Sequence, residues 1–275
     1  MQDPTLSHNQ SHAAQIASLI SQIRTQSPLV HNITNYVVMN NTANALLSIG
    51  ASPVMAHAEE EVEDMVRIAS ALVINIGTLS PRWVDAMKRA LHTASGLGKP
   101  VVLDPVGAGA TPYRNQVLKE LLETASPDII RGNASEIVAL YSAQEQTKGV
   151  DSTLSSDKAV EAARALCLSY GCVTVISGER DYVVSEDSVG VVEAGVPMMA
   201  KVTGMGCTAS ALLGAFAAVE ADTAEAAFAG MMVMGVAGEM ASEKAEGPGT
   251  FQSHFLDALW RIDEENLAVR MNQSG

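Results

Sequence analysis

The sequence predicts one mostly parallel α/β domain, a central sheet flanked by helices, because short apolar runs alternate along the chain with segments of helical periodicity. The runs are continuously apolar, as in strands that are buried on both faces of a parallel sheet. Hydrophobic residues make up 47% of the 275 residues but aromatic residues only 4%, which favours close helix–sheet contacts over a β-sandwich. We expect a single domain over residues 1–275, with residues 1–11 as a flexible N-terminus.

Five short apolar runs are the expected parallel strands. Four of them are rich in Val, Ile or Leu and stop at a glycine or a polar residue; Gly77 follows one run and Asp104-Pro105 ends another. The runs cover residues 52–55, 71–76, 101–103, 129–130 and 173–176. Residues 181–193 alternate differently, which indicates an antiparallel hairpin.

The segments between these runs have helical signals at their ends. Gly50 is suited to the position just past a helix, and Pro81 to the first helical turn. The expected helices cover residues 12–25, 36–49, segments that begin at Pro81 and near Ala134, residues 156–170, and nearly all of the chain from Cys207 onward. A polar loop is expected over residues 31–35 and a mobile insertion from Ser142 to Ser156. The near-helical spacing of Met231, Met232, Met234 and Met240 indicates core packing rather than a ligand site.

The charge of the chain excludes one class of partner. The formal net charge is −14 and the isoelectric point is near 4.8, whereas nucleic-acid binding through a basic face needs clustered Lys and Arg. An anionic ligand would have to be attracted locally, by helix ends, a few basic side chains or a metal ion.

The cysteines and the apolar segments indicate the cellular compartment of the protein. Cys167, Cys172 and Cys207 have no metal-ligand spacing, and nothing indicates a disulfide, so a reducing cytoplasm is expected. Residues 1–12 lack an apolar signal core, and Met231 to Met240 is too short to span a bilayer. No membrane association is expected.

A glycine-containing turn before a small-residue helix is the strongest local motif. Gly204 and Gly206 allow close approach of the backbone to a ligand, and the helix that follows presents N–H groups at the positive end of its dipole. A phosphoryl group would fit there, with Cys207 in the first turn where a reacting group would lie. A simple tight connection remains the alternative.

Polar residues follow the ends of several expected strands, where ligands bind in open parallel sheets. They are Asn35, Thr78, Asp104, Arg131, Asn133 and Ser177, with Met55 and Gly77 at the same edge. Asp104 and Glu136 could hold Mg²⁺, but Asp104 could instead be an N-cap and Glu136 part of a capping box with Asn133. Arg131 could clamp a phosphate or form a surface ion pair.

Three more polar residues have two interpretations each. Ser177 could contact a nucleotide or cap a turn, and Thr78 could line the pocket or cap the helix that Pro81 opens. His31 could be a general base, but a lone His beside Asn is more often a hydrogen-bonded structural residue.

Seven motifs follow one another from about residue 28 to residue 260. They read HNITN (31–35), TANALLSIGASPVM (42–55), NIGTL (75–79), LDPV (103–106), IRGNASEI (130–137), TGMGC (203–207) and EGPGTF (246–251). In type and order they resemble the motifs of the hydroxyethylthiazole kinase family. The departures are small: Asn32 stands where relatives often have Cys, and Met205 where Thr is common.

This resemblance implies a ribokinase-like fold and ATP-dependent phosphorylation of 4-methyl-5-(2-hydroxyethyl)thiazole in thiamine diphosphate biosynthesis and salvage. It also implies a homotrimer with active sites between subunits. By motif, Met55 and Gly204 would contact the thiazole, and Asn35 and Thr78 would line its pocket.

The same resemblance implies that Arg131 and Ser177 contact ATP and that Asp104 and Glu136 serve Mg²⁺. Gly204, Gly206 and Cys207 would form the catalytic turn. Charge on the transferred phosphoryl group must be neutralised, which Mg²⁺, Arg131 and the N–H groups of residues 204–207 would do. A thiol is mostly protonated at neutral pH, so Cys207 is expected chiefly to position the acceptor and only secondarily to accept its proton.

Two other classes remain open at this point. Other enzymes of the fold, such as a hydroxymethylpyrimidine kinase or an ADP-dependent dehydratase, usually carry Asp where this chain has Cys207. A non-catalytic ligand-binding relative is disfavoured because Asp104, Glu136 and Arg131 are all present. A Rossmann dehydrogenase is disfavoured because no Gly-x-Gly-x-x-Gly follows the first strand.

Overall fold

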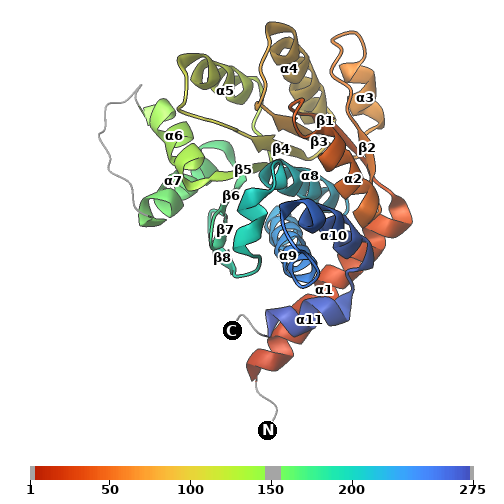
Figure 1. Ribbon diagram of the computed structural model, residues 1–275. Coiled ribbons are helices and arrows are strands. Elements are labelled where there is room, and N and C mark those ends of the chain that lie inside the picture. The colour runs from red at the N-terminus through yellow and green to blue at the C-terminus, as the bar shows by residue number, and fades with distance from the viewer. Residues whose placement is uncertain (1–3, 146–155, 273–275) are drawn as a thin grey trace.

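A computed structural model describes residues 4–145 and 156–272 and contains one sheet of eight strands in the order β2-β1-β3-β4-β5-β6-β7-β8 (Figure 1). Strands β1 to β6 are parallel, and β7 and β8 add an antiparallel hairpin at one edge. The strands are β1 (Leu29–Ile33), β2 (Ser52–Val54), β3 (Ala71–Asn75), β4 (Val101–Asp104), β5 (Ile129–Asn133), β6 (Val173–Ser177), β7 (Asp181–Val184) and β8 (Val189–Val192).

Helices cover both faces of this sheet (Figure 1). On one face lie α3 (Val62–Ile68), α4 (Pro81–Gly96), α5 (Pro112–Thr124), α6 (Ala134–Glu145) and α7 (Ser156–Tyr170). On the other lie α1 (Pro4–Gln26), α2 (Met39–Ile49), α8 (Met205–Ala217), α9 (Thr223–Ser242), α10 (Pro248–Arg261) and α11 (Glu264–Met271), with the 3₁₀ turn η1 (Pro197–Lys201) before α8.

Successive side chains of each buried strand point to opposite faces of the sheet, so a hydrophobic core lies on each face. In β3, Val73 packs with the α8 and α9 side, whereas Leu72 and Ile74 pack with the α4 side. Helix α8 comes very close to the sheet at Gly214, where a Cβ would lie 2.6 Å from Val73 Cγ2. The small residues of α8 therefore let its N-terminus reach the carboxyl ends of the central strands.

Most of the expected elements are confirmed. Helix α2 ends at Gly50, whose left-handed backbone (φ 106°) caps the helix, and α4 begins at Pro81. Residues 181–193 form the antiparallel hairpin, and the Met231–Met234 methionines lie in the core. Within the described residues, no helix has the length and hydropathy needed to cross a bilayer.

Some element boundaries differ from the sequence prediction. The predicted loop at 31–35 is wrong, because residues 29–33 form β1; its buried His31 Nε2 bonds Ala56 O (2.8 Å) and Asn32 Nδ2 bonds Val30 O (2.9 Å). Residues 52–54 form a half-buried edge strand rather than a buried one.

The terminal and inserted segments also differ. Helix α1 begins at Pro4, so residues 4–11 of the expected flexible N-terminus are helical. Helix α2 begins at Met39, three residues later than expected. The expected insertion from Ser142 to Ser156 lies for the most part outside the described residues, since 146–155 are not among them.

Candidate active site

The N-terminus of α8 lies over the carboxyl ends of the central strands, where the glycine turn was expected to act. Gly204 caps the helix with a left-handed backbone (φ 86°), and a Cβ there would lie 2.9 Å from Val38 Cγ1. The first intrahelical bond runs from Thr208 N to Gly204 O (2.8 Å). The N–H groups of Met205, Gly206 and Cys207 therefore precede the helical ladder and can receive an anion.

Gly206 has a role that the sequence did not indicate. A Cβ on this residue would lie 2.6 Å from Arg131 Nη1 and 3.1 Å from Nη2. Glycine is needed here because the guanidinium of the protein itself, rather than only a ligand, packs against the helix backbone.

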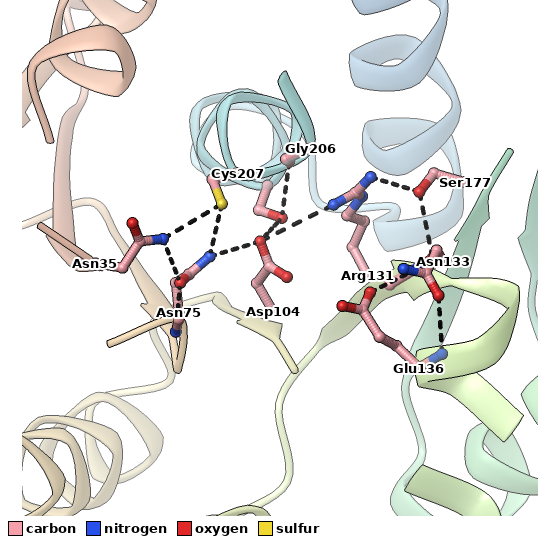
Figure 2. A network of polar contacts seen from close by, with 12 residues as sticks. Asn35, Asn75, Asp104, Arg131, Asn133, Glu136, Ser177, Gly206 and Cys207 are labelled. Carbon is pink, nitrogen blue, oxygen red and sulfur yellow. Dashed lines mark hydrogen bonds and ion pairs between the residues drawn. The ribbon is translucent and has the colours of Figure 1, made fainter. Parts of the chain in front are cut away.

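Asp104 ends β4 and is completely buried beneath this helix (Figure 2). Its Oδ2 accepts hydrogen bonds from Asn75 Nδ2 (2.8 Å) and Ser210 Oγ (2.7 Å) and lies 4.0 Å from Arg131 Nη1. Its Oδ1 has no hydrogen-bond partner among the described residues. Burial raises the pKa of Asp104 to about 6, against the opposing effect of Arg131.

The interpretation of Asp104 as an N-cap is therefore wrong. The next helix, α5, is capped by Thr111, whose side chain accepts from Arg114 N. Burying a carboxylate with one unpartnered oxygen costs free energy of folding unless a proton or a cation binds to that oxygen. This arrangement fits a carboxylate that faces a bound cation.

Cys207 lies in the first turn of α8 with its sulfur toward two amides (Figure 2). Its Sγ accepts from Asn35 Nδ2 (3.4 Å) and Asn75 Nδ2 (3.2 Å). Burial, and then the charge of Asp104, raise the pKa of Cys207 to about 11. The side chain is thus a neutral thiol at physiological pH.

Arg131 lies in β5 rather than after it, because the strand continues to Asn133. Its guanidinium donates to Ser177 Oγ and approaches Asp104, and only 9% of the residue is exposed, so the surface ion pair is excluded. A cavity of about 420 Å³ adjoins Ser177 and is lined also by Gly178 and Tyr182. The guanidinium therefore joins the buried carboxylate to the edge of this cavity.

Glu136 forms the capping box that was one of its two interpretations. Its Oε2 accepts from Asn133 N (2.9 Å), and Asn133 Oδ1 accepts from Glu136 N (2.9 Å). Its Oε1 accepts from Gly107 N (2.8 Å), which ties the loop after β4 to the start of α6. Capping leaves further lone pairs on both oxygens, so it does not exclude a second role in holding a cation.

Asn35, one of the residues expected to line the substrate pocket, lies on the side of Cys207 away from Arg131 (Figure 2). Asn35 follows β1 and donates to Asn75 Oδ1 (2.9 Å), and Thr78 Oγ1 accepts from Tyr36 N (3.2 Å). Thr78 does not cap α4, because Ser80 does. Met55 follows the edge strand β2 and is half-buried.

His31 lies in β1, where its Nε2 donates to a backbone carbonyl and burial lowers its pKa. It has the structural role that its sequence context favoured.

Two residues of this network were missed by the sequence analysis. Asn75 joins Asp104 to Cys207, and Ser210 donates to Asp104 from one turn further along α8. A signal for Asn75 existed, because it is a single amide within the apolar run 71–76, near the expected ligand edge. No comparable signal marks Ser210, which lies among other small residues.

Comparisons with known proteins agree with this geometry. A model of the hydroxyethylthiazole kinase family matches residues 20–265. A hydroxyethylthiazole kinase of Syntrophus aciditrophicus is 58% identical over 253 residues, which cover 92% of this chain and 94% of the relative. The solved structure of a hydroxyethylthiazole kinase protein from Pyrococcus horikoshii is 42% identical, with a TM-score of 0.85 over 94% of this chain and 96% of its own.

A more distant structure shows the fold alone. A ribokinase-like superfamily protein from Enterococcus faecalis is 14% identical, with a TM-score of 0.61 over 86% of this chain and 87% of its own. The ribokinase-like fold, the seven motifs and the identity over nearly the full length lead to one conclusion: this chain belongs to the hydroxyethylthiazole kinase family.

Proposed function

We propose that the protein transfers the γ-phosphoryl group of ATP to the hydroxyl of 4-methyl-5-(2-hydroxyethyl)thiazole, which gives the thiazole phosphate used in thiamine diphosphate biosynthesis and salvage. One observation carries the proposal: in a chain of this family, a fully buried carboxylate, Asp104, lies beside Arg131 under a helix N-terminus. These groups suit phosphoryl transfer, in which catalysis is mostly positioning and charge stabilisation.

The nucleotide would bind on the Ser177 side. Arg131 and Ser177 would contact its phosphates, and the cavity next to Ser177 would hold the rest of the molecule. Arg131 lies between this cavity and Asp104, so its guanidinium is placed to stabilise charge on the transferred group. The N–H groups of Gly206 and Cys207 would receive the same group at the helix end.

Asp104 and Glu136 would hold Mg²⁺, directly or through water. The unpartnered Oδ1 of Asp104 fits this role, because carboxylate oxygen is the ligand that Mg²⁺ prefers. Among the described residues, no three His, Cys, Asp or Glu side chains are grouped so that they could hold a metal ion, so water and phosphate oxygens would complete the coordination. A bound Mg²⁺ would supply charge neutralisation for the phosphates.

The thiazole alcohol would bind on the other side of Cys207, against Asn35, Met55, Thr78 and Gly204. We assign Cys207 to positioning of the acceptor hydroxyl. Its raised pKa, about 11, leaves little thiolate at neutral pH, so proton acceptance by sulfur is secondary.

We also propose a cytoplasmic homotrimer with active sites between subunits. Tyr36 and Val37 directly follow Asn35 and are 65% and 63% exposed, so a partner subunit that covered them would complete the pocket. The free thiols of Cys167, Cys172 and Cys207 suit a reducing compartment. Sedimentation analysis tests the trimer.

A coupled ADP-release assay with thiazole, pyrimidine and sugar alcohols tests the activity. We expect turnover to be fastest with the thiazole alcohol and to require both ATP and Mg²⁺. Faster turnover of a pyrimidine alcohol would favour a hydroxymethylpyrimidine kinase. A thermal shift with the thiazole alcohol and no turnover of any alcohol would indicate a non-catalytic binding protein.

A further inference from the structure

The side-chain amide of Asn75 makes four hydrogen bonds at the centre of the site. It ends β3, between β1 and β4, and is only 1% exposed. Its Nδ2 donates to Asp104 Oδ2 (2.8 Å) and to Cys207 Sγ (3.2 Å), and its Oδ1 accepts from Asn35 Nδ2 (2.9 Å) and Gly77 N (2.9 Å). Both hydrogens and both lone pairs of the amide are thereby occupied.

The orientation of this amide is determined by its surroundings. The backbone N–H of Gly77 can only donate, so the oxygen of Asn75 must face it and the nitrogen must face Asp104. The neighbouring Asn35 is fixed in the same way, because its Oδ1 accepts from Val37 N (3.1 Å). The two amide nitrogens are thus both directed at Cys207.

These contacts determine what the thiol can do. A neutral thiol sulfur has two lone pairs, and each of them faces an amide N–H, one from Asn35 and one from Asn75. The S–H bond is consequently left to point away from both amides. The sulfur is held in one orientation instead of rotating about its Cα–Cβ bond.

We propose that Asn75 is a positioning residue of the phosphoryl-transfer centre, which fixes the Cys207 thiol relative to the Asp104 carboxylate by donating one N–H to each. The inference rests on the proposed function and extends it to a residue that acts through its contacts with Cys207 and Asp104. A residue that only completed a buried polar network would support the fold without acting through Cys207.

A double-mutant cycle separates these two roles. The cycle compares the native protein, Asn75→Ala, Cys207→Ala and the double variant in the ADP-release assay with the thiazole alcohol, ATP and Mg²⁺. We expect Asn75→Ala to lower kcat about tenfold, as for the loss of one or two buried hydrogen bonds, and to change either KM less than about threefold. In the Cys207→Ala background the same substitution should lower kcat by a clearly smaller factor.

Asn32 provides a matched control. It is also an asparagine that is 1% exposed, and it lies on the adjacent strand β1. Within the described part of the chain, its Nδ2 bonds only Val30 O. Asn32→Ala should leave kcat within about twofold of native, because its amide is not part of the network around Cys207. Native turnover in the same assay tests the proposed function separately from the role of Asn75.

Three outcomes would overturn the proposal: an unchanged kcat in Asn75→Ala, an equal loss of kcat in both backgrounds, or an equal loss in Asn32→Ala. If Asn75→Ala does not fold, Asn75→Ser retains one donor and takes its place in the cycle. Failure of both variants to fold would show that Asn75 serves the fold, and this too would overturn the proposal.

Discussion

Gly206→Ala tests the placement of Arg131 with the smallest possible change. Alanine is favoured over glycine in a helix by about 1 kcal/mol, so the backbone of α8 tolerates the substitution. The added Cβ would lie 2.6 Å from Arg131 Nη1, whereas heavy atoms in contact are optimally about 3.5 Å apart. The guanidinium must therefore move by roughly 1 Å, which changes its contacts with Ser177 and Asp104.

The magnitude follows from what the guanidinium does. A displacement of about 1 Å in a positioning group can cost on the order of 100-fold in rate, and loss of a charged hydrogen bond costs about 1.5–3 kcal/mol. We expect Gly206→Ala to lower kcat/KM for ATP by about 10- to 100-fold, with little change in the KM for the thiazole alcohol. The thermal midpoint should stay near native, because the clashing atom is the end of a flexible side chain.

The assay is an ATP titration at saturating thiazole alcohol with the coupled release of ADP. Gly96→Ala is the matched control, since Gly96 is also helical and a Cβ there would meet no atom within 4 Å. The control should have native kinetics. A value of kcat/KM for ATP within about twofold of native in a folded Gly206→Ala protein would refute the reasoning about Arg131.

Three further predictions concern the same centre. Gly204→Val should abolish turnover and also lower the thermal midpoint, because a Cβ meets Val38 and the backbone is left-handed; a native thermal midpoint and normal kcat/KM would contradict this. Cys207→Asp should remain active. Cys207→Ala should lose less activity than the roughly 10²–10⁴-fold that removal of a general base costs. The contradicting result is a native kcat that rises with pH through a thiol pKa, with both variants inactive. In the absence of metal, the free energy of unfolding of Asp104→Asn should increase relative to that of the native protein between pH 4 and pH 7. The folded-state pKa of Asp104, about 6, lies above its unfolded value, so the native protein loses stability as pH rises through this window; thermal midpoints in EDTA that show no such trend would contradict it.

The sequence predicted the outline of the fold because apolar runs and helix-end residues are local signals. It placed the polar edge correctly for Asp104 and Arg131, since each follows or ends an apolar run. It missed β1 because His31 and Asn32 are polar yet buried, and their hydrogen-bond partners were not apparent from sequence alone.

Long-range contacts account for what remained hidden. Glycine is required at position 206 because Arg131, which is 75 positions away in the chain, packs against it. Asn75 likewise contacts Cys207 although the two are 132 positions apart. Spacing within one segment contains no information on such pairs. The resemblance to the family supplied residue roles, but it did not supply the hydrogen bonds that hold those residues in place.

The most direct test of the account is to titrate native, Arg131→Ala and Asp104→Asn proteins with ATP and with Mg²⁺ at saturating thiazole alcohol. We expect Arg131→Ala to lower kcat/KM for ATP by an amount equivalent to about 1.5–3 kcal/mol, and Asp104→Asn to require a higher Mg²⁺ concentration for the same activity. In both variants the KM for the thiazole alcohol should stay near native. Loss of thiazole affinity together with normal ATP and Mg²⁺ titrations would contradict the assigned division of the site.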